Sequence, residues 1–182
     1  MDKKPQPKSR LVFVTDIDQK KGRGVVRRLF ELNEEDPSKD IILVISSYGG
    51  DVYEFMGIHD AMNLVECDVA TLAIGKAMSC GLLLLMSGTK GKRFVTPNTT
   101  LLTHEMGVAA EGQLTDVKTE MAENERLQKM IHDLFLEYTK VKEADVKKWS
   151  GKDTYLSASK AVRLGIADHI VKSPQVWKKL DL

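Results

Sequence analysis

Short apolar runs alternate with longer amphipathic segments along the first half of this 182-residue chain. Residues 11–14, 40–45 and 69–74 predict strands, while 22–33 and 52–65 between them carry apolar residues at helical spacing. The second of these strands is almost continuously apolar, which is typical of a strand buried on both faces. This alternation predicts α/β layers around a largely parallel sheet.

The second half of the chain carries one unusually long helical pattern. Residues 112–139 predict that helix, and residues 143–149 predict a short one after it. Ser157 is placed to cap a last helix, which Gly165 would end. We therefore expect a polar N-terminal tail over residues 1–10, one domain over residues 11–172 and a C-terminal tail over residues 173–182.

Charge and composition exclude several classes of function. The chain has 27 Lys and Arg against 26 Asp and Glu, which gives no electrostatic reason to bind nucleic acid or an anionic membrane. Its longest apolar run, Leu82–Met86, is too short to span a bilayer, and no signal-peptide pattern is present. Cys67 and Cys80 suggest no disulfide framework, so a cytoplasmic protein is expected. The absence of a HExxH motif or similar cluster argues against a metal hydrolase and predicts no cofactor.

Two glycine-bearing turns are expected where functional sites gather in such sheets, at the carboxyl ends of strands. One contains Gly49-Gly50 and the other runs from Gly75 to Ser79. Small residues on both sides of Ser79 permit a sharp strand-to-helix turn that would expose its hydroxyl. The same position suits an ordinary helix N-cap, and a lone serine in this pattern is a weak signal.

A nucleophilic serine also needs a base, an orienting acid and donors for an oxyanion. His104 lies just past a predicted strand end, and Asp153 lies in a connection that begins with glycine. The backbone N–H groups near Gly49-Gly50 could face a developing oxyanion. Spacing alone does not bring these groups together. The other histidines fall in helices or near the final strand and are expected to be structural or at the surface: His59, His132 and His169.

Four segments resemble one known family, the proteolytic subunits of the Clp protease (ClpP). Ile45–Val52 (ISSYGGDV) is similar to the family's Ile-Asn-Ser-Pro-Gly-Gly-x-Val segment. Ile74–Gly81 (IGKAMSCG) is similar to its nucleophile segment. Residues 91–104 resemble the run that delivers its catalytic histidine, and residues 152–168 resemble its acid-bearing segment. These matches occur in order over roughly residues 10–172, which single motifs would not do by chance.

The resemblance implies a ClpP/crotonase-type fold of repeated ββα units with a protruding handle helix over about residues 112–139. It implies a serine-type endopeptidase that hydrolyses peptides and unfolded proteins. Ser79 would be the nucleophile, His104 the base and Asp153 the acid that orients it. The backbone N–H groups of Gly50 and Cys80 would bind the oxyanion.

The resemblance also implies partners. Family members form seven-membered rings, often stacked in pairs as tetradecamers, that enclose their active sites and work with a Clp-type ATPase unfoldase. No nucleic acid or membrane partner is expected. The N-terminus here is polar where the family has an apolar segment that engages the ATPase, and Gly151-Lys152 stands where an acidic–Arg pair often links rings.

Two departures lie close to the implied site and keep other functions open. Tyr48 replaces the proline of the Ser-Pro-Gly-Gly turn, and Glu105 follows His104 where the family usually has Gln. A catalytically silent ring subunit or scaffold is therefore an alternative. An acyl-CoA enzyme of the crotonase type would share the fold but would have no use for the set of Ser79, His104 and Asp153.

Overall fold

The computed structural model describes residues 9–149 and 151–174. Seven strands are present in this part of the chain: β1 (Leu11–Ile17), β2 (Ile41–Gly50), β3 (Val69–Met78), β4 (Arg93–Val95), β5 (Thr100–Thr103), β6 (Thr154–Ser157) and β7 (His169–Ile170). Its six helices are α1 (Gln19–Glu35), α2 (Val52–Leu64), α3 (Cys80–Met86), α4 (Leu114–Tyr138), α5 (Glu143–Trp149) and α6 (Ala158–Arg163).

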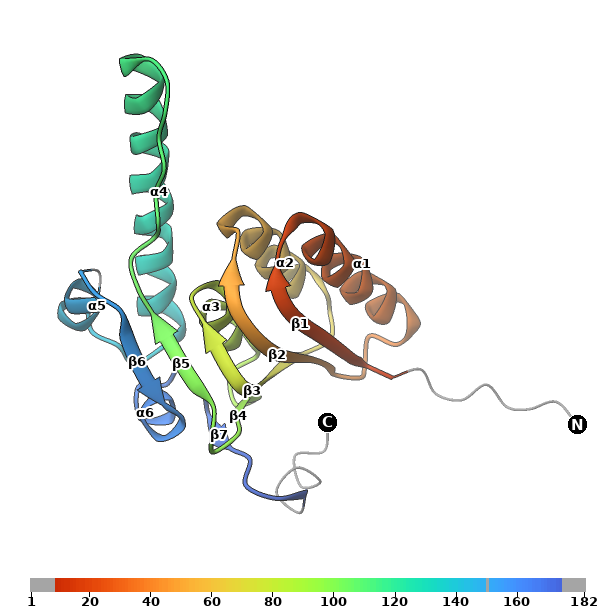
Figure 1. The fold of residues 1–182 in the computed structure, drawn as a ribbon. Helices are drawn as coiled ribbons and strands as arrows, with labels where there is room; N and C mark the ends of the chain where they lie inside the picture. Colours follow the sequence, from red (N-terminus) through yellow and green to blue (C-terminus); the bar gives the residue numbers. More distant parts are fainter. Residues whose placement is uncertain (1–8, 150, 175–182) are drawn as a thin grey trace, which may run out of the picture.

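The strands form a single sheet in which β3 has two sets of partners. The main path runs β1-β2-β3-β4-β7, and each of these pairs is parallel. Residues 71–73 of β3 pair with β4, whereas Lys76–Met78 pair with β5. β6 then pairs with β5 in the antiparallel sense. The carboxyl end of β3 therefore lies between β2 and β5 (Figure 1). Gly50 ends β2, and His104 directly follows β5.

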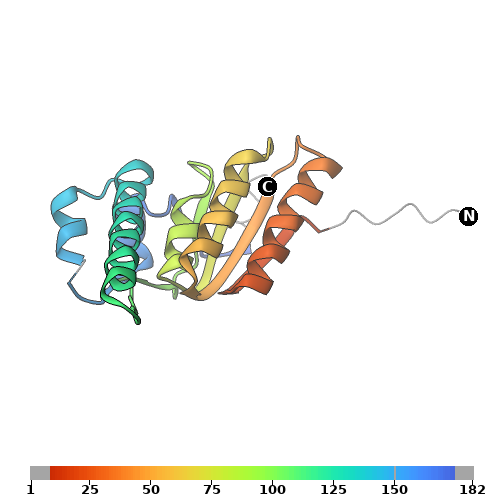
Figure 2. The same cartoon turned by 90° about the horizontal axis from the view of Figure 1, so that it is seen from above.

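Helices α1, α2 and α3 line up on one side of the sheet, as Figure 2 shows from above. They cover a core that includes Leu29, Phe55 and Leu82, all with 0% of their surface exposed. Residues 41–45 of β2 are all buried. The prediction of a strand buried on both faces is therefore confirmed, as is the α/β class with a largely parallel sheet.

Both predicted turns at the strand ends are wrong in one respect, because the strands continue through them. β2 runs to Gly50 and β3 to Met78. The register between these strands shifts after Ile45, and pairing resumes at Ser47 with Ala77. Gly75 adopts a φ of 72°, which glycine tolerates without a Cβ clash. The glycines here permit irregular bends inside the strands, and do not end them.

Helix boundaries follow the capping residues. α1 begins at Gln19, three residues before the predicted start, because the side chain of Asp18 accepts a hydrogen bond from the N–H of Lys21. Ser157 caps α6 as predicted and accepts from the N–H of Lys160. Gly165 has a φ of 70° just past that helix, which confirms it as the stop signal.

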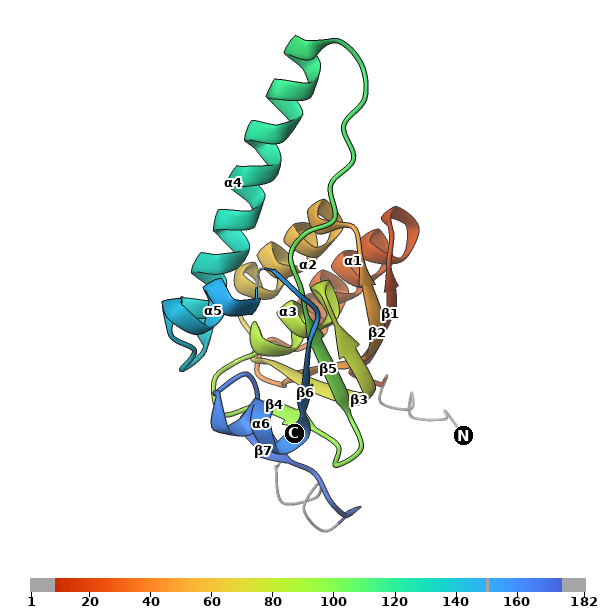
Figure 3. The same ribbon diagram turned by 60° about the vertical axis from the view of Figure 1, so that its left-hand side comes forward.

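Helix α4 projects away from the rest of the molecule, and the segment that precedes it runs alongside it (Figure 3). Only its second half is packed on the core, through Leu127, Ile131, Leu134 and Phe135. The predicted protruding helix over residues 112–139 is confirmed with bounds of Leu114 and Tyr138.

Most of the two predicted tails lies outside the described residues, namely 1–8 and 175–182. Arg10, the last residue of the predicted N-terminal tail, is held by hydrogen bonds to the carbonyl oxygens of Leu32, Asp36, Lys39 and Asp40. Among the described helices, none has the length and apolar character that a membrane span requires.

Candidate active site

Ser79 stands at the junction of β3 and α3 in an unusual backbone conformation. Its φ of 52° and ψ of −127° make it the only non-glycine residue with positive φ in the described part of the chain. Such a conformation costs about 1–3 kcal/mol and persists only where surrounding structure enforces it. Here the N–H of Ser79 donates to the carbonyl oxygen of Leu102 on β5 at 2.8 Å. The strand pairing therefore fixes the turn that carries the serine.

The hydroxyl of Ser79 does not cap α3, although the residue occupies the N-cap position. The sequence left open whether this serine is a cap or a nucleophile. Its side chain instead lines a small pocket together with His104, Val52 and Leu83. Ser79 is therefore not a side-chain cap, and it shares this pocket with His104.

The Gly49-Gly50 bend presses directly against the serine turn. A Cβ on Gly49, which has a φ of 106°, would lie 2.7 Å from the Cβ of Ser79 and 2.9 Å from the carbonyl oxygen of Met78. Contacts this short cannot be accommodated without moving backbone. Glycine at position 49 therefore lets the end of β2 approach the serine closely enough for backbone groups of both turns to share one site.

Cys80 links the same two turns through its side chain. Its Sγ donates to the carbonyl oxygen of Gly50 at 3.3 Å, and the residue is 2% exposed. Burial raises the pKa of this thiol to about 11. Because the thiolate is the reactive form, Cys80 stays a protonated, structural thiol near neutral pH.

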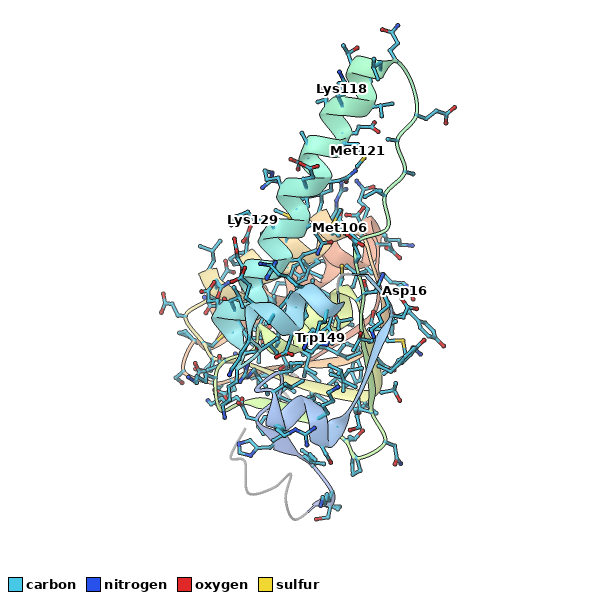
Figure 4. The ribbon with its side chains drawn as sticks, turned by 90° about the vertical axis from the view of Figure 1, so that its left-hand side faces the viewer. Asp16, Met106, Lys118, Met121, Lys129 and Trp149 are labelled. Atoms are coloured by element: carbon cyan, nitrogen blue, oxygen red, sulfur yellow. The ribbon has the colours of Figure 1, made fainter. Side chains whose placement is uncertain are left out.

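His104 follows directly after β5, and its side chain is partly buried. Besides the pocket that it shares with Ser79, it lines a second small pocket whose walls include Phe135 and Trp149. The rings of Phe135 on α4 and Trp149 on α5 lie 5.8 Å apart in an edge-to-face arrangement. The two helices therefore build the apolar surroundings of the imidazole, and Figure 4 shows Trp149 on α5 next to the base of α4.

Asp153 reaches the site through the pairing of β5 with β6. The last paired residues of these strands are Thr103 and Thr154. His104 and Asp153 are the next residues on each side, so both lie at the same end of the antiparallel ladder. The structure thus brings the predicted base and acid to neighbouring positions. In the described chain no hydrogen bond joins Asp153 to His104 or His104 to Ser79.

The other three histidines are engaged elsewhere. His59 packs between the rings of Phe55 and Tyr138, with ring centres 5.8 and 5.6 Å away, and burial lowers its pKa. His169 stacks on Phe94 at 5.5 Å. His132 lines a groove beside α4, and its Nε2 is buried without a hydrogen-bond partner in the described structure. Of the four histidines, only His104 lines a pocket with Ser79.

Tyr48 and Glu105, the two departures from the family pattern, both point to solvent. Tyr48 is 69% exposed, and the Nζ of Lys76 lies 4.1 Å from the centre of its ring. Glu105 is exposed and borders the groove beside α4. No group of three or more His, Cys, Asp or Glu residues in the described ranges could hold a metal ion.

Two contributors to the site are not revealed by the motifs that the sequence offers. The carbonyl oxygen of Leu102 is a backbone group, which no sequence pattern reveals. Gln128 lies on α4, where its Oε1 accepts a hydrogen bond from the N–H of Met106 at 3.0 Å. Its only sequence signal is its spacing from Ile131 and Phe135, which places it near the buried face of the helix.

A comparison with known families matches one family model to most of the chain. The family model described as Clp protease matches residues 6–174, which include every element of the described fold. Ser79, His104 and Asp153 all fall within the match. The family is one of proteases, and this gives the site a peptidase context. The chain belongs to the Clp protease family.

Proposed function

We propose that this chain is a serine-type endopeptidase that hydrolyses peptides and unfolded proteins through Ser79, His104 and Asp153. The observation that carries the proposal is the state of Ser79. It is held at positive φ by β5, does not cap its helix, and lines one pocket with His104. A merely structural serine would need neither the strained turn nor the neighbouring imidazole.

The reaction follows the chemistry of acyl transfer. Ser79 Oγ attacks the carbonyl carbon of the scissile peptide bond, and His104 accepts the hydroxyl proton. The negative charge that develops on the carbonyl oxygen is bound by the N–H groups of Gly50 and Cys80. His104 then gives its proton to the leaving amine, and water repeats the sequence to release the acid. Asp153 holds the imidazole in the required tautomer and stabilises the imidazolium.

Assembly belongs to the same proposal. We infer a homo-oligomer, a heptameric ring that stacks as a tetradecamer, with the active sites inside a chamber. The projecting half of α4, which has no core to pack on in one chain, supports association with further copies. The three catalytic side chains share no hydrogen bonds in the single chain, so activity is expected to depend on assembly. A Clp-type ATPase would supply unfolded substrate.

The experiment is labelling of the purified protein with a fluorophosphonate, which reacts with activated serines. Intact mass and peptide mapping should show one adduct, on Ser79. The adduct should be absent from the Ser79→Ala and His104→Ala variants and retained in Ser159→Ala, which changes an exposed serine on α6. Fractions separated by sedimentation would be labelled in parallel, with the adduct expected in the oligomer.

The alternative is a catalytically silent ring subunit or scaffold, which the departures from the family pattern at Tyr48 and Glu105 keep open. A folded, oligomeric protein that takes up no fluorophosphonate would favour this alternative and would contradict the peptidase proposal. Full labelling of a monomer would support the proposed triad but would contradict the requirement for assembly.

A further inference from the structure

We propose that Gln128 is a positioning residue for the catalytic base: its side-chain oxygen holds the backbone of Met106 and thereby places His104 beside Ser79. This inference rests on the proposed peptidase function. It assigns to a helix side chain outside the family's catalytic motifs a role in the chemical step.

His104 lies midway between two hydrogen-bonded anchors. Two residues before it, the carbonyl oxygen of Leu102 accepts from the N–H of Ser79 at 2.8 Å. Two residues after it, the N–H of Met106 donates to Gln128 Oε1 at 3.0 Å. The first anchor joins the base-bearing segment to the nucleophile turn, and the second joins it to α4. The backbone is therefore anchored on both sides of His104.

The second anchor is the polar attachment of its segment, and the side chain of Met106 also packs against the core. β5 ends at Thr103 and α4 begins at Leu114, so residues 104–112 have no strand or helix partner. Of the described residues, those from 104 to 112 make no other hydrogen bond. Figure 4 shows Met106 beside α4, at the place where this segment passes the helix. Without the bond to Gln128, the segment after His104 would have no polar attachment to the fold.

Gln128 is itself well held. It lies between Leu127 and Ile131, which are 2% and 9% exposed, on the part of α4 that packs on the core. Its side chain lines the same pocket as His104, and that pocket is walled by Phe135 and Trp149. The anchor therefore comes from a rigid part of the helix, as a positioning role requires.

The chemistry of the bond decides which substitutions preserve it. Met106 offers an N–H donor, so residue 128 must supply an acceptor at the same reach. Glutamate keeps that acceptor and the length of glutamine. Leucine has a similar volume but no acceptor, and leaves the N–H of Met106 without its partner. Gln128→Glu should thus rescue what Gln128→Leu loses.

The test compares Gln128→Leu and Gln128→Glu with wild type in the assembled protein. The control is Lys129→Leu, which changes the next side chain on α4, one that is 75% exposed and pairs with Asp133. Four measurements would be made: the rate of fluorophosphonate labelling at Ser79, peptide kinetics that give kcat and KM, the melting temperature, and hydrogen exchange at the amide of Met106.

We expect Gln128→Leu to lower the labelling rate and kcat by about 10- to 100-fold, since small displacements of catalytic groups have effects of that order. KM should stay within about twofold, because the loss is in the chemical step. Met106 should exchange faster in this variant. Gln128→Glu should label within about threefold of wild type and keep the slow exchange of Met106. Lys129→Leu should resemble wild type in all four measurements.

Two results would overturn the positioning role while leaving the peptidase intact. One is labelling of Gln128→Leu at the wild-type rate. The other is equal loss in the Leu and Glu variants, which would point to a structural requirement for glutamine itself. Absence of labelling in the wild-type protein would instead contradict the peptidase proposal and the positioning role together, so the two failures are distinguishable.

Discussion

The two halves of the candidate site are built by different means. The nucleophile half consists of backbone: the end of β2 and the end of β3 are in direct contact, with a glycine where any side chain would collide. The half with His104 and Asp153 consists of loops at the end of a short ladder, attached to α4 and α5 through side chains. One half is fixed by the sheet itself, while the other depends on packing that a few side chains provide.

This difference indicates how each half responds to change. In the half built from backbone, a Cβ at Gly49 would collide with the serine turn, so that position requires glycine. The contact between the two strand ends does not depend on particular side chains. A side-chain-built segment accepts changes at most positions and fails at the few that anchor it. The segment after His104 can therefore shift without disturbing the contact between the ends of β2 and β3.

The largest expected difference between the two halves comes from a substitution that removes the proposed acid and leaves the fold unchanged. Asp153→Asn should lower kcat by about 10³- to 10⁴-fold, because an amide favours the wrong imidazole tautomer. The melting temperature should not change, since Asp153 is exposed. Kinetics on a peptide and thermal unfolding would check this, with Lys152→Ala as the neighbouring control. Retention of most of the activity would remove Asp153 from the triad.

Adding one methyl group to the backbone-built half should have the next largest effect. Gly49→Ala would place a Cβ against Ser79 at a φ of 106°, and we expect about a 100-fold loss of labelling, since displacements of about 1 Å have effects of that order. Stability should fall by about 1–3 kcal/mol through backbone strain. Labelling rates and denaturant unfolding would measure both.

The matched control for that variant is Gly57→Ala on α2, where a Cβ would meet nothing within 4 Å. This substitution should stabilise the protein by up to about 1 kcal/mol, because alanine is the better helix former. Equal activity in Gly49→Ala and wild type would show that the two turns have room to separate, against the proposed construction of the nucleophile half.

The smallest effect on catalysis is expected from a substitution near the C-terminal end of α4, where Arg93 pairs with Asp168. Its effect on stability should be larger. Arg93 is 3% exposed, pairs with Asp168, and donates to the last carbonyl oxygens of α3 and α4, those of Met86 and Tyr138. Asp168→Asn should lower the free energy of unfolding at neutral pH by about 2 kcal/mol. This is less than for a fully buried pair, because solvent reaches Asp168. Peptide kcat should stay within about threefold of wild type.

The same variant should show a defined pH dependence. Burial acts to raise the pKa of Asp168, but Arg93 and the backbone N–H groups of Gly91 and Arg93 hold it below the ordinary value of 3.8. A lowered pKa in the folded state means that the pair stabilises fully above about pH 4 and loses its effect as the carboxylate protonates. The difference between wild type and Asp168→Asn should therefore shrink on acidification. A difference that grew below pH 4 would contradict this assignment.

Much of this construction could be predicted from the sequence. Apolar periodicity predicted the strands and helices, because burial against a common core is what imposes those periods. The continuous run in β2 correctly indicated burial on both faces, and Gly165 correctly marked a helix end. The identities of Ser79, His104 and Asp153 as candidates came from the family resemblance, and their spatial proximity came from strand pairing.

The remainder depended on contacts between distant parts of the chain. Glycines at 49, 50 and 75 predicted turns, yet register shifts let the strands continue through them. The anchor at Gln128 joins residues 22 positions apart through one backbone N–H. Neither feature leaves a local pattern, since both are decided by which backbone groups face each other after folding.

The bond between Ser79 and Leu102 has a consequence for biosynthesis. A nascent chain that has emerged only through α3 already contains the serine, but it lacks the strand that holds the serine turn in place. The proposed base, His104, arrives 25 residues later, and the proposed acid, Asp153, arrives only just before β6. Because non-local pairings form slowly, a partly synthesised chain lacks the complete proposed site, and the order of translation would delay peptidase activity until the domain is nearly whole.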